Sequence, residues 1–127
     1  MSRRVKCVFE ASQAGLWQQL DLLRADYLQR RHFAFRLVEN YSELIPGRKF
    51  QVDVALPDLK IGAEYQGGDF MRKSGHTNVK GLARDRYKLN HAQLNGWILF
   101  QFGAAETESG EAMILVERAI ELRRRQS

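Results

Sequence analysis

Two runs of alternating apolar residues, one on each side of Pro57 and Asp58, constrain the fold of this chain more than any other feature of its sequence. Apolar side chains occupy every second position in residues 50–56 and again in residues 59–65. Alternation of period two is typical of β-strands, and a proline followed by an aspartate favours a tight connection between them. The pattern predicts a β-hairpin with strands at residues 49–56 and 59–66.

The register of this hairpin follows if residues 57–60 form the connecting loop. Val54 then lies opposite Ala63, and Asp53 lies opposite Glu64. One face of the hairpin would be apolar, and the other would carry two carboxylates whose β-carbons are about 4.5–5.5 Å apart. Two such charges repel each other by about 1 kcal/mol in bulk water and by about 4 kcal/mol at the effective dielectric of a protein surface.

A divalent cation offsets that repulsion directly, because Mg²⁺ prefers oxygen ligands and uses one or two carboxylates together with substrate phosphates. A second interpretation fits the same residues. Asp53, Glu64 and Gln66 alternate along the strands and could simply form the solvated face of an antiparallel sheet. The residue pattern leaves both interpretations open.

Periodicity and helix-terminating residues predict the remaining elements. Ser12 is a suitable N-cap for a helix that runs to about residue 30, with leucines at three- and four-residue steps. Residues 33–41, rich in aromatic and branched side chains, predict a first strand. Further along, the sequence predicts a loop at residues 69–78, a helix at 78–95 stopped by Gly96, a strand at 97–102 and a final helix at 106–125.

This order of elements predicts an α/β fold in which a mixed sheet of about four strands is flanked by helices. A right-handed crossover through the helix at residues 78–95 would connect the third strand to the fourth. A length of 127 residues suits a single domain.

Composition narrows the classes of function. The chain carries 20 Lys and Arg against 15 Asp and Glu, a net charge of +5 that favours a phosphate-bearing partner. Cys7 is the only cysteine, which excludes an intramolecular disulfide and a thiolate zinc cluster. No apolar run approaches the roughly 20 residues that span a bilayer, and no apolar segment follows Arg3 and Arg4. The sequence predicts a cytoplasmic protein without a membrane segment.

Residues 48–57 and 60–68 resemble the core of the PD-(D/E)XK nuclease superfamily, in particular its small stand-alone members from phages and bacteria, related to very-short-patch repair and Holliday-junction endonucleases. With Gly75-His76-Thr77, Asp85, Lys88 and residues 96–100, the resemblance covers about residues 33–102. It implies that residues 1–127 form a single nuclease domain with a restriction-endonuclease-like core, in the order α-β-β-β-α-β followed by a C-terminal helix.

The resemblance also implies a metal site. Asp53 matches the acid of the first half-motif and Glu64 the acid of the second, so these side chains and the Tyr65 carbonyl would hold Mg²⁺, for which Mn²⁺ could substitute. The chain departs from the motif at Val52, where the family has proline, and at Gln66, where the family usually has lysine.

Two residues are candidates for the work of the missing lysine. Some family members use glutamine at the position of Gln66, and others recruit a lysine from the following helix, where Lys88 is the candidate. Arg84, Lys88 and His91 lie on one face of that helix by their spacing, and a solvated basic stripe explains the same spacing.

The implied activity is Mg²⁺-dependent endonucleolytic hydrolysis of DNA, selective for a structure such as a junction, flap or end, with a homodimer where paired cuts are made. Family members often add an acid from the first helix, for which Asp21 is the candidate and Glu10 the reserve. The alternative is a catalytically inactive nuclease-fold protein that binds nucleic acid. The candidate DNA contacts are Arg72, Lys73, His76, Arg84 and His91.

Overall fold

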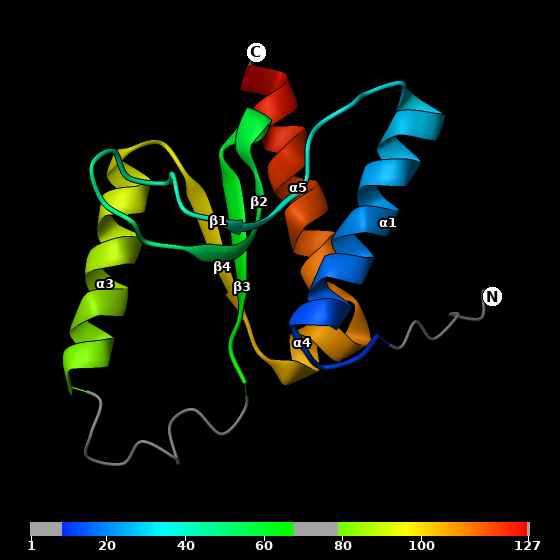
Figure 1. Cartoon of the computed structure of the whole chain (residues 1–127). Coiled ribbons are helices and arrows are strands. Elements are labelled where there is room, and N and C mark those ends of the chain that lie inside the picture. The colour runs from blue at the N-terminus through cyan, green and yellow to red at the C-terminus, as the bar shows by residue number, and fades with distance from the viewer. Residues whose placement is uncertain (1–8, 68–78, 127) are drawn as a thin grey trace.

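The computed structural model describes residues 9–67 and 79–126, in which one four-stranded sheet is packed between helices (Figure 1). The strand order is β1-β2-β3-β4, with β1, β2 and β3 paired antiparallel and β3 and β4 paired parallel. The predicted α/β class and mixed sheet are therefore confirmed. The elements are α1 (Gln13–Arg31), β1 (Val38–Tyr41), β2 (Val52–Leu56), the 3₁₀ turn η1 (Pro57–Leu59), β3 (Ile61–Tyr65), α3 (Val79–Leu94), β4 (Ile98–Phe102), α4 (Ala104–Ser109) and α5 (Glu111–Gln126).

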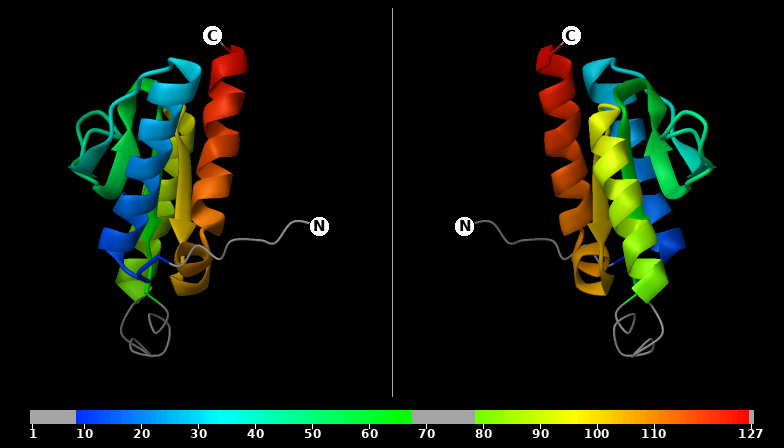
Figure 2. Two further views of the ribbon diagram at one scale, coloured as in Figure 1. Left: turned by 90° about the vertical axis from the view of Figure 1, so that its right-hand side faces the viewer. Right: turned by 90° about the vertical axis from the view of Figure 1, so that its left-hand side faces the viewer.

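Helices cover both faces of the sheet: α3 lies on one face, and α1 and α5 lie on the other (Figures 1 and 2). Each face has its own apolar core. The larger core joins α1 and α5 to side chains of the sheet that include Val54, Leu56, Ile61, Ala63 and Phe102. The smaller core lies on the α3 side and contains Leu44, Ile45, Phe50, Val52, Ala55, Ala92 and Trp97. None of the helices in the described ranges is long and apolar enough to cross a bilayer.

The hairpin of β2 and β3 has the predicted register, with Val54 opposite Ala63 and Leu56 opposite Ile61. Its loop spans residues 57–60, as predicted. Residues 57–59 form η1, which is closed by a hydrogen bond of 3.2 Å from the Lys60 N–H to the Pro57 carbonyl, with Lys60 in the left-handed region (φ 55°).

The first strand is shorter than predicted, because residues 33–37 pack against α1 instead of joining the sheet. His32 caps α1 in the left-handed conformation (φ 53°), and the Phe33 N–H donates to the Tyr27 carbonyl at 3.1 Å. The rings of Phe33 and Phe35 then meet the Tyr27 ring edge-on, with centroids 6.0 and 5.9 Å away. The aromatic residues that suggested a strand are thus core residues of the helix face.

The predicted final helix is divided into α4 and α5 by Gly110, whose φ of 89° lies outside the helical range. The buried Gln19 side chain of α1 bridges the break. Its Nε2 donates to the Thr107 carbonyl at 2.7 Å, and its Oε1 accepts from the Met113 N–H at 3.2 Å. One amide thus adds a second hydrogen bond to a carbonyl of α4 and to an N–H of α5, which also bond to the N–H and the carbonyl of Gly110.

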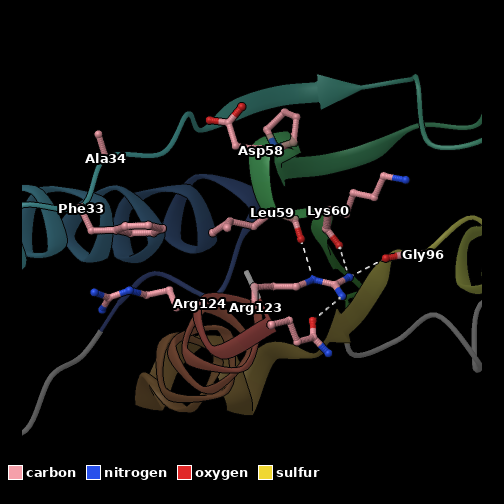
Figure 3. Close-up of a pocket in the computed structure, with 10 residues that line it drawn as sticks. Phe33, Ala34, Asp58, Leu59, Lys60, Gly96, Arg123 and Arg124 are labelled. Carbon is pink, nitrogen blue, oxygen red and sulfur yellow. Dashed lines mark hydrogen bonds between the residues drawn. The ribbon is translucent and has the colours of Figure 1, made fainter.

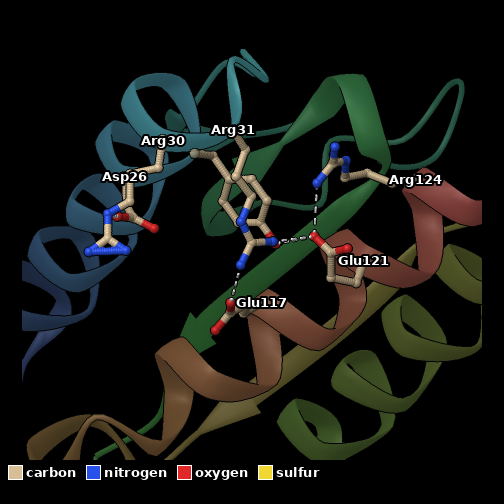
Figure 4. A network of polar contacts seen from close by, with 7 residues as sticks. Asp26, Arg30, Arg31, Glu117, Glu121 and Arg124 are labelled. Atoms are coloured by element: carbon tan, nitrogen blue, oxygen red, sulfur yellow. Dashed lines mark hydrogen bonds and ion pairs between the residues drawn. The ribbon is translucent and has the colours of Figure 1, made fainter.

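A polar network joins α1 to α5 along their solvent side (Figure 4). The Tyr27 hydroxyl donates to Glu121 Oε2 at 2.5 Å, and the same carboxylate accepts from Arg31 at 2.9 Å and from Arg124 at 3.1 Å. Burial raises the pKa of Tyr27 well above its usual value, and the hydrogen bond from Tyr27 lowers the pKa of Glu121. The network fixes the two helices that form one wall of the larger core.

The end of the sheet next to η1 has an open pocket of about 670 Å³ (Figure 3). Arg123 of α5 reaches across it and donates to the carbonyls of Leu59 (2.7 Å), Lys60 (3.1 Å) and Gly96 (2.5 Å). Gly96 has φ 87° and follows α3, as the sequence predicted for the residue that stops this helix. Arg123 therefore ties α5 to the hairpin turn and to the turn before β4.

Candidate metal centre and nucleic-acid face

The candidate acids lie near the carboxyl end of β3, at the opposite end of this strand from η1 (Figure 1). The start of α1 adjoins this end, because the Tyr65 hydroxyl donates to the Ala11 carbonyl at 2.9 Å. Side chains from β2, β3, β4, α1 and α3 converge here, so residues distant in sequence are brought to one place.

Asp53 makes two hydrogen bonds at this end of the sheet. Its Oδ2 accepts from the backbone N–H of Tyr65 at 2.7 Å, and its Oδ1 accepts from Gln13 Nε2 at 2.7 Å. The carboxylate therefore lies beside the peptide bond that joins Glu64 to Tyr65, and it is held there from the α1 side of the sheet.

Glu64 is engaged from the α3 side. Lys88 Nζ donates to Glu64 Oε2 and, at 3.0 Å, to the Gln51 carbonyl. The second carboxylate oxygen accepts from Gln101 Nε2 at 3.3 Å, across the parallel pairing of Glu64 with Gln101. Glu64 and Lys88 are each only 8% exposed, so the two charges form a nearly buried ion pair. The predicted position of Lys88, which reaches the hairpin from the following helix, is confirmed.

The strict alternation that predicted one polar face for both carboxylates is interrupted in β2. Val54 belongs to the core on the α1 side, whereas Val52 belongs to the core on the α3 side, so the alternation breaks at Asp53. In β1, Glu39 pairs with Val54 and Tyr41 pairs with Val52. Asn40, between them, has a left-handed backbone (φ 49°). This irregularity lies in the strand beside Asp53. Mutual repulsion of the acids is relieved by separate donors.

The atoms available at this place are nevertheless of the type that a hard divalent cation binds. Asp53, Glu64 and the Tyr65 carbonyl offer only oxygen, the ligand that Mg²⁺ and Mn²⁺ take, and Mg²⁺ commonly uses one or two protein carboxylates. Within the described residues, no group of three or more His, Cys, Asp or Glu side chains could hold a metal ion. A metal at this place would therefore use two side chains and a backbone oxygen.

Gln66 follows directly after β3, and its N–H donates to the Phe102 carbonyl at 2.7 Å. Its side chain lines a groove of about 180 Å³ next to Glu64's partner Gln101, between β4 and α3. The other lining residues are Leu82, Asp85, Arg86 and Leu89. Gln66 thus lies at the candidate site, as the resemblance implied, and its role in a reaction stays a prediction.

The acids proposed from the first segment of the chain have other partners. Asp21 forms an ion pair with Arg24 of its own helix at 2.8 Å. Glu10 is exposed, and its carbonyl accepts from the Ser12 N–H at 2.9 Å. The side chain of α1 that reaches Asp53 is Gln13, the first residue of the helix, so the predicted additional acid is replaced at this position by an amide.

Of the predicted DNA contacts, Arg72, Lys73 and His76 lie outside the described residues, whereas Arg84 and His91 lie on α3 next to Lys88. Sequence reasoning missed Gln13 and Gln101. The parallel pairing of β3 with β4 was the available signal for Gln101, since it sets that residue beside Glu64. No comparable signal in the sequence pointed to Gln13.

Comparison with protein-family models, with curated proteins and with solved structures gives no match for this chain.

Proposed function

We propose that this protein is a Mg²⁺-dependent endonuclease of the PD-(D/E)XK kind, with a restriction-endonuclease-like core, that hydrolyses phosphodiester bonds in DNA. The main support for this proposal is the nearly buried ion pair of Glu64 in β3 with Lys88 in α3, the helix that follows this strand. The motif's lysine is missing at Gln66, and Lys88 supplies an ammonium group at the adjacent acid. Asp53 completes the set through its bond to the Tyr65 N–H.

In this proposal Asp53, Glu64 and the Tyr65 carbonyl hold the ion, which when bound neutralises phosphate charge and lowers the pKa of a water. Lys88 is held by Glu64 and by the Gln51 carbonyl, so its charge is already oriented before substrate arrives. A preorganised cation stabilises negative charge that develops on the phosphate, whereas the neutral Gln66 can only orient water or phosphate.

A second candidate is a nuclease-fold protein that binds nucleic acid without cutting it. The observation that favours it is the separation of the two acids, since Asp53 is bonded to Gln13 of α1 and Glu64 to Lys88 of α3. Both acids would have to share one ion for the enzymatic proposal to hold.

A cleavage assay tests the proposal. Supercoiled, linear, branched and single-stranded DNA are incubated with the protein in Mg²⁺, in Mn²⁺ and in chelator. We expect metal-dependent cutting that is lost in Asp53→Asn and in Glu64→Gln and retained in the control Asp26→Asn, which alters an exposed pair with Arg30 on α1. Binding without cutting in any metal would instead support the second candidate.

The same proposal carries three consequences. The domain would select a DNA structure such as a junction, flap or end. Paired cuts would require two active sites and therefore a homodimer. An enzyme acting on intracellular DNA would work in the cytoplasm.

A further inference from the structure

A ladder of alternating arginines and aromatic rings lies on the α3 side of the sheet. We define the basic aromatic ladder as Arg48, Phe50, Arg84, Tyr87 and His91. The Arg48 guanidinium lies 4.8 Å from the centroid of the Tyr87 ring and 5.0 Å from that of Phe50, and it donates to the Tyr87 hydroxyl at 3.0 Å. Arg84 lies 5.6 Å from the Phe50 centroid, and His91 stacks on Tyr87 at 4.0 Å.

The arginines of this ladder contact aromatic rings, whereas arginines on the opposite side of the molecule are paired with carboxylates. Arg24, Arg30 and Arg31 of α1 each form an ion pair with a carboxylate. Among the described residues, neither Arg48 nor Arg84 forms an ion pair, although both are exposed. Aromatic rings hold a guanidinium by cation–π attraction without cancelling its charge. The ladder therefore presents two oriented positive charges that remain available to an anion.

The ladder adjoins the candidate site. Phe50 directly precedes Gln51, whose carbonyl accepts from Lys88, and Tyr87 directly precedes Lys88 in α3. An anionic chain that runs along Arg48 and Arg84 would thus pass beside the Glu64–Lys88 pair. A guanidinium offers N–H donors in a planar fork that matches a phosphate group, which makes repeated phosphates a suitable partner.

We propose that the basic aromatic ladder binds the phosphate backbone of a nucleic-acid strand, with Arg48 and Arg84 as phosphate contacts and Tyr87 as the residue that positions Arg48. The inference rests on the proposed function for the direction in which the strand runs, toward Lys88, and its test measures binding alone. Contacts of this kind fix the position of the backbone and carry no sequence preference.

The experiment is a salt titration of binding, with labelled single-stranded and duplex DNA oligonucleotides in chelator, so that no cutting occurs. Each lost phosphate contact should reduce the slope of log K against log salt by about 0.9 for duplex and about 0.7 for single strands. We expect this decrease for Arg48→Gln and for Arg84→Gln, with roughly tenfold weaker binding in the double variant. The control Arg118→Gln removes an exposed arginine of α5, on the opposite face, and should leave the slope unchanged.

Tyr87 separates positioning from charge. Tyr87→Leu removes the ring under Arg48 but no charge, so we expect weaker binding with an unchanged slope, and Tyr87→Phe should restore most of the affinity. The proposal is overturned if the slopes of Arg48→Gln and Arg84→Gln equal that of Arg118→Gln. A protein that cuts no DNA but shows the expected slopes would refute the nuclease proposal and support the ladder.

Discussion

At the scale of single residues, the pair of Lys88 with Glu64 dominates the energetics of the candidate site. Each residue is only 8% exposed, so both charges have lost most of their hydration. Their mutual attraction and the further bonds to Gln51 and Gln101 offset that loss. Removing one partner would leave the other buried and uncompensated, which is the costly case for an ion pair of this kind.

The sequence predicted repulsion between Glu64 and Asp53, whereas the structure pairs Glu64 with Lys88. We predict that Glu64→Ala lowers the free energy of unfolding by roughly 3–5 kcal/mol, because Lys88 loses its counter-charge. Urea denaturation measures the change. The double variant Glu64→Leu/Lys88→Met should recover most of the loss. A single variant as stable as the unaltered protein would contradict the pairing.

A second prediction at this scale concerns rate. If Lys88 stabilises the transition state, Lys88→Met should lower the single-turnover rate of DNA cleavage by roughly 10²-fold or more while changing DNA affinity much less. Thermal melting shows whether the variant is folded under the conditions of the assay. An unchanged single-turnover rate at saturating enzyme would return the catalytic role to Gln66 or His76.

At the scale of elements, the junction of α4 and α5 depends on a side chain from α1. Gln19 is fully buried, and its amide is bonded to both the Thr107 carbonyl and the Met113 N–H, 88 and 94 residues away in sequence. A hydrogen bond within a protein contributes about 0.5–1.5 kcal/mol to stability. The Gln19 amide therefore links α1 to both α4 and α5.

We predict that Gln19→Leu, which has nearly the same size, destabilises the protein by roughly 1–3 kcal/mol in total, because the Thr107 carbonyl and the Met113 N–H each lose one hydrogen bond. The matched control is Gln18→Leu at the neighbouring exposed position of the same helix. Chemical denaturation of both variants makes the comparison. Equal stabilities would show that water replaces the lost bonds.

At the scale of the whole molecule, two carboxylates that join distant segments have lowered pKa values. The hydrogen bonds from Arg36 lower the pKa of Asp58 from 3.8, and the hydrogen bond from Tyr27 lowers the pKa of Glu121 from 4.5. A lowered pKa in the folded state means that the stabilisation is complete above the unfolded pKa. It is lost as pH falls through the folded value.

We therefore predict constant stability from neutral pH down to about pH 5 and a decline below it, as protons bind these two carboxylates. The side chains are 42% and 36% exposed, so solvent screening limits each contribution to about 1 kcal/mol or less. Thermal melting as a function of pH should show a shallower acid decline in Asp58→Asn/Glu121→Gln. An identical decline in that variant would assign acid lability to other groups.

The positions of most strands and helices, and the pairing of β2 with β3, could be read from the chain because they depend on neighbouring residues. These signals act over a few residues: the alternation around Pro57, the N-cap at Ser12 and the helix stop at Gly96. A short stretch of sequence is therefore enough to predict each of them. For the same reason, the amino-acid sequence alone was enough to assign the two acids to adjacent strands.

Long-range packing decided the rest. Residues 33–37 leave the sheet because their rings meet Tyr27, and the last helix divides where Gln19 bonds both of its parts. Asp53 and Glu64 bond to different helices because Gln13 and Lys88 approach from opposite sides of the sheet. The hydrogen bonds of Gln13, Gln19 and Lys88 join residues 24 to 94 positions apart, and no local pattern in the sequence specifies such distant partners.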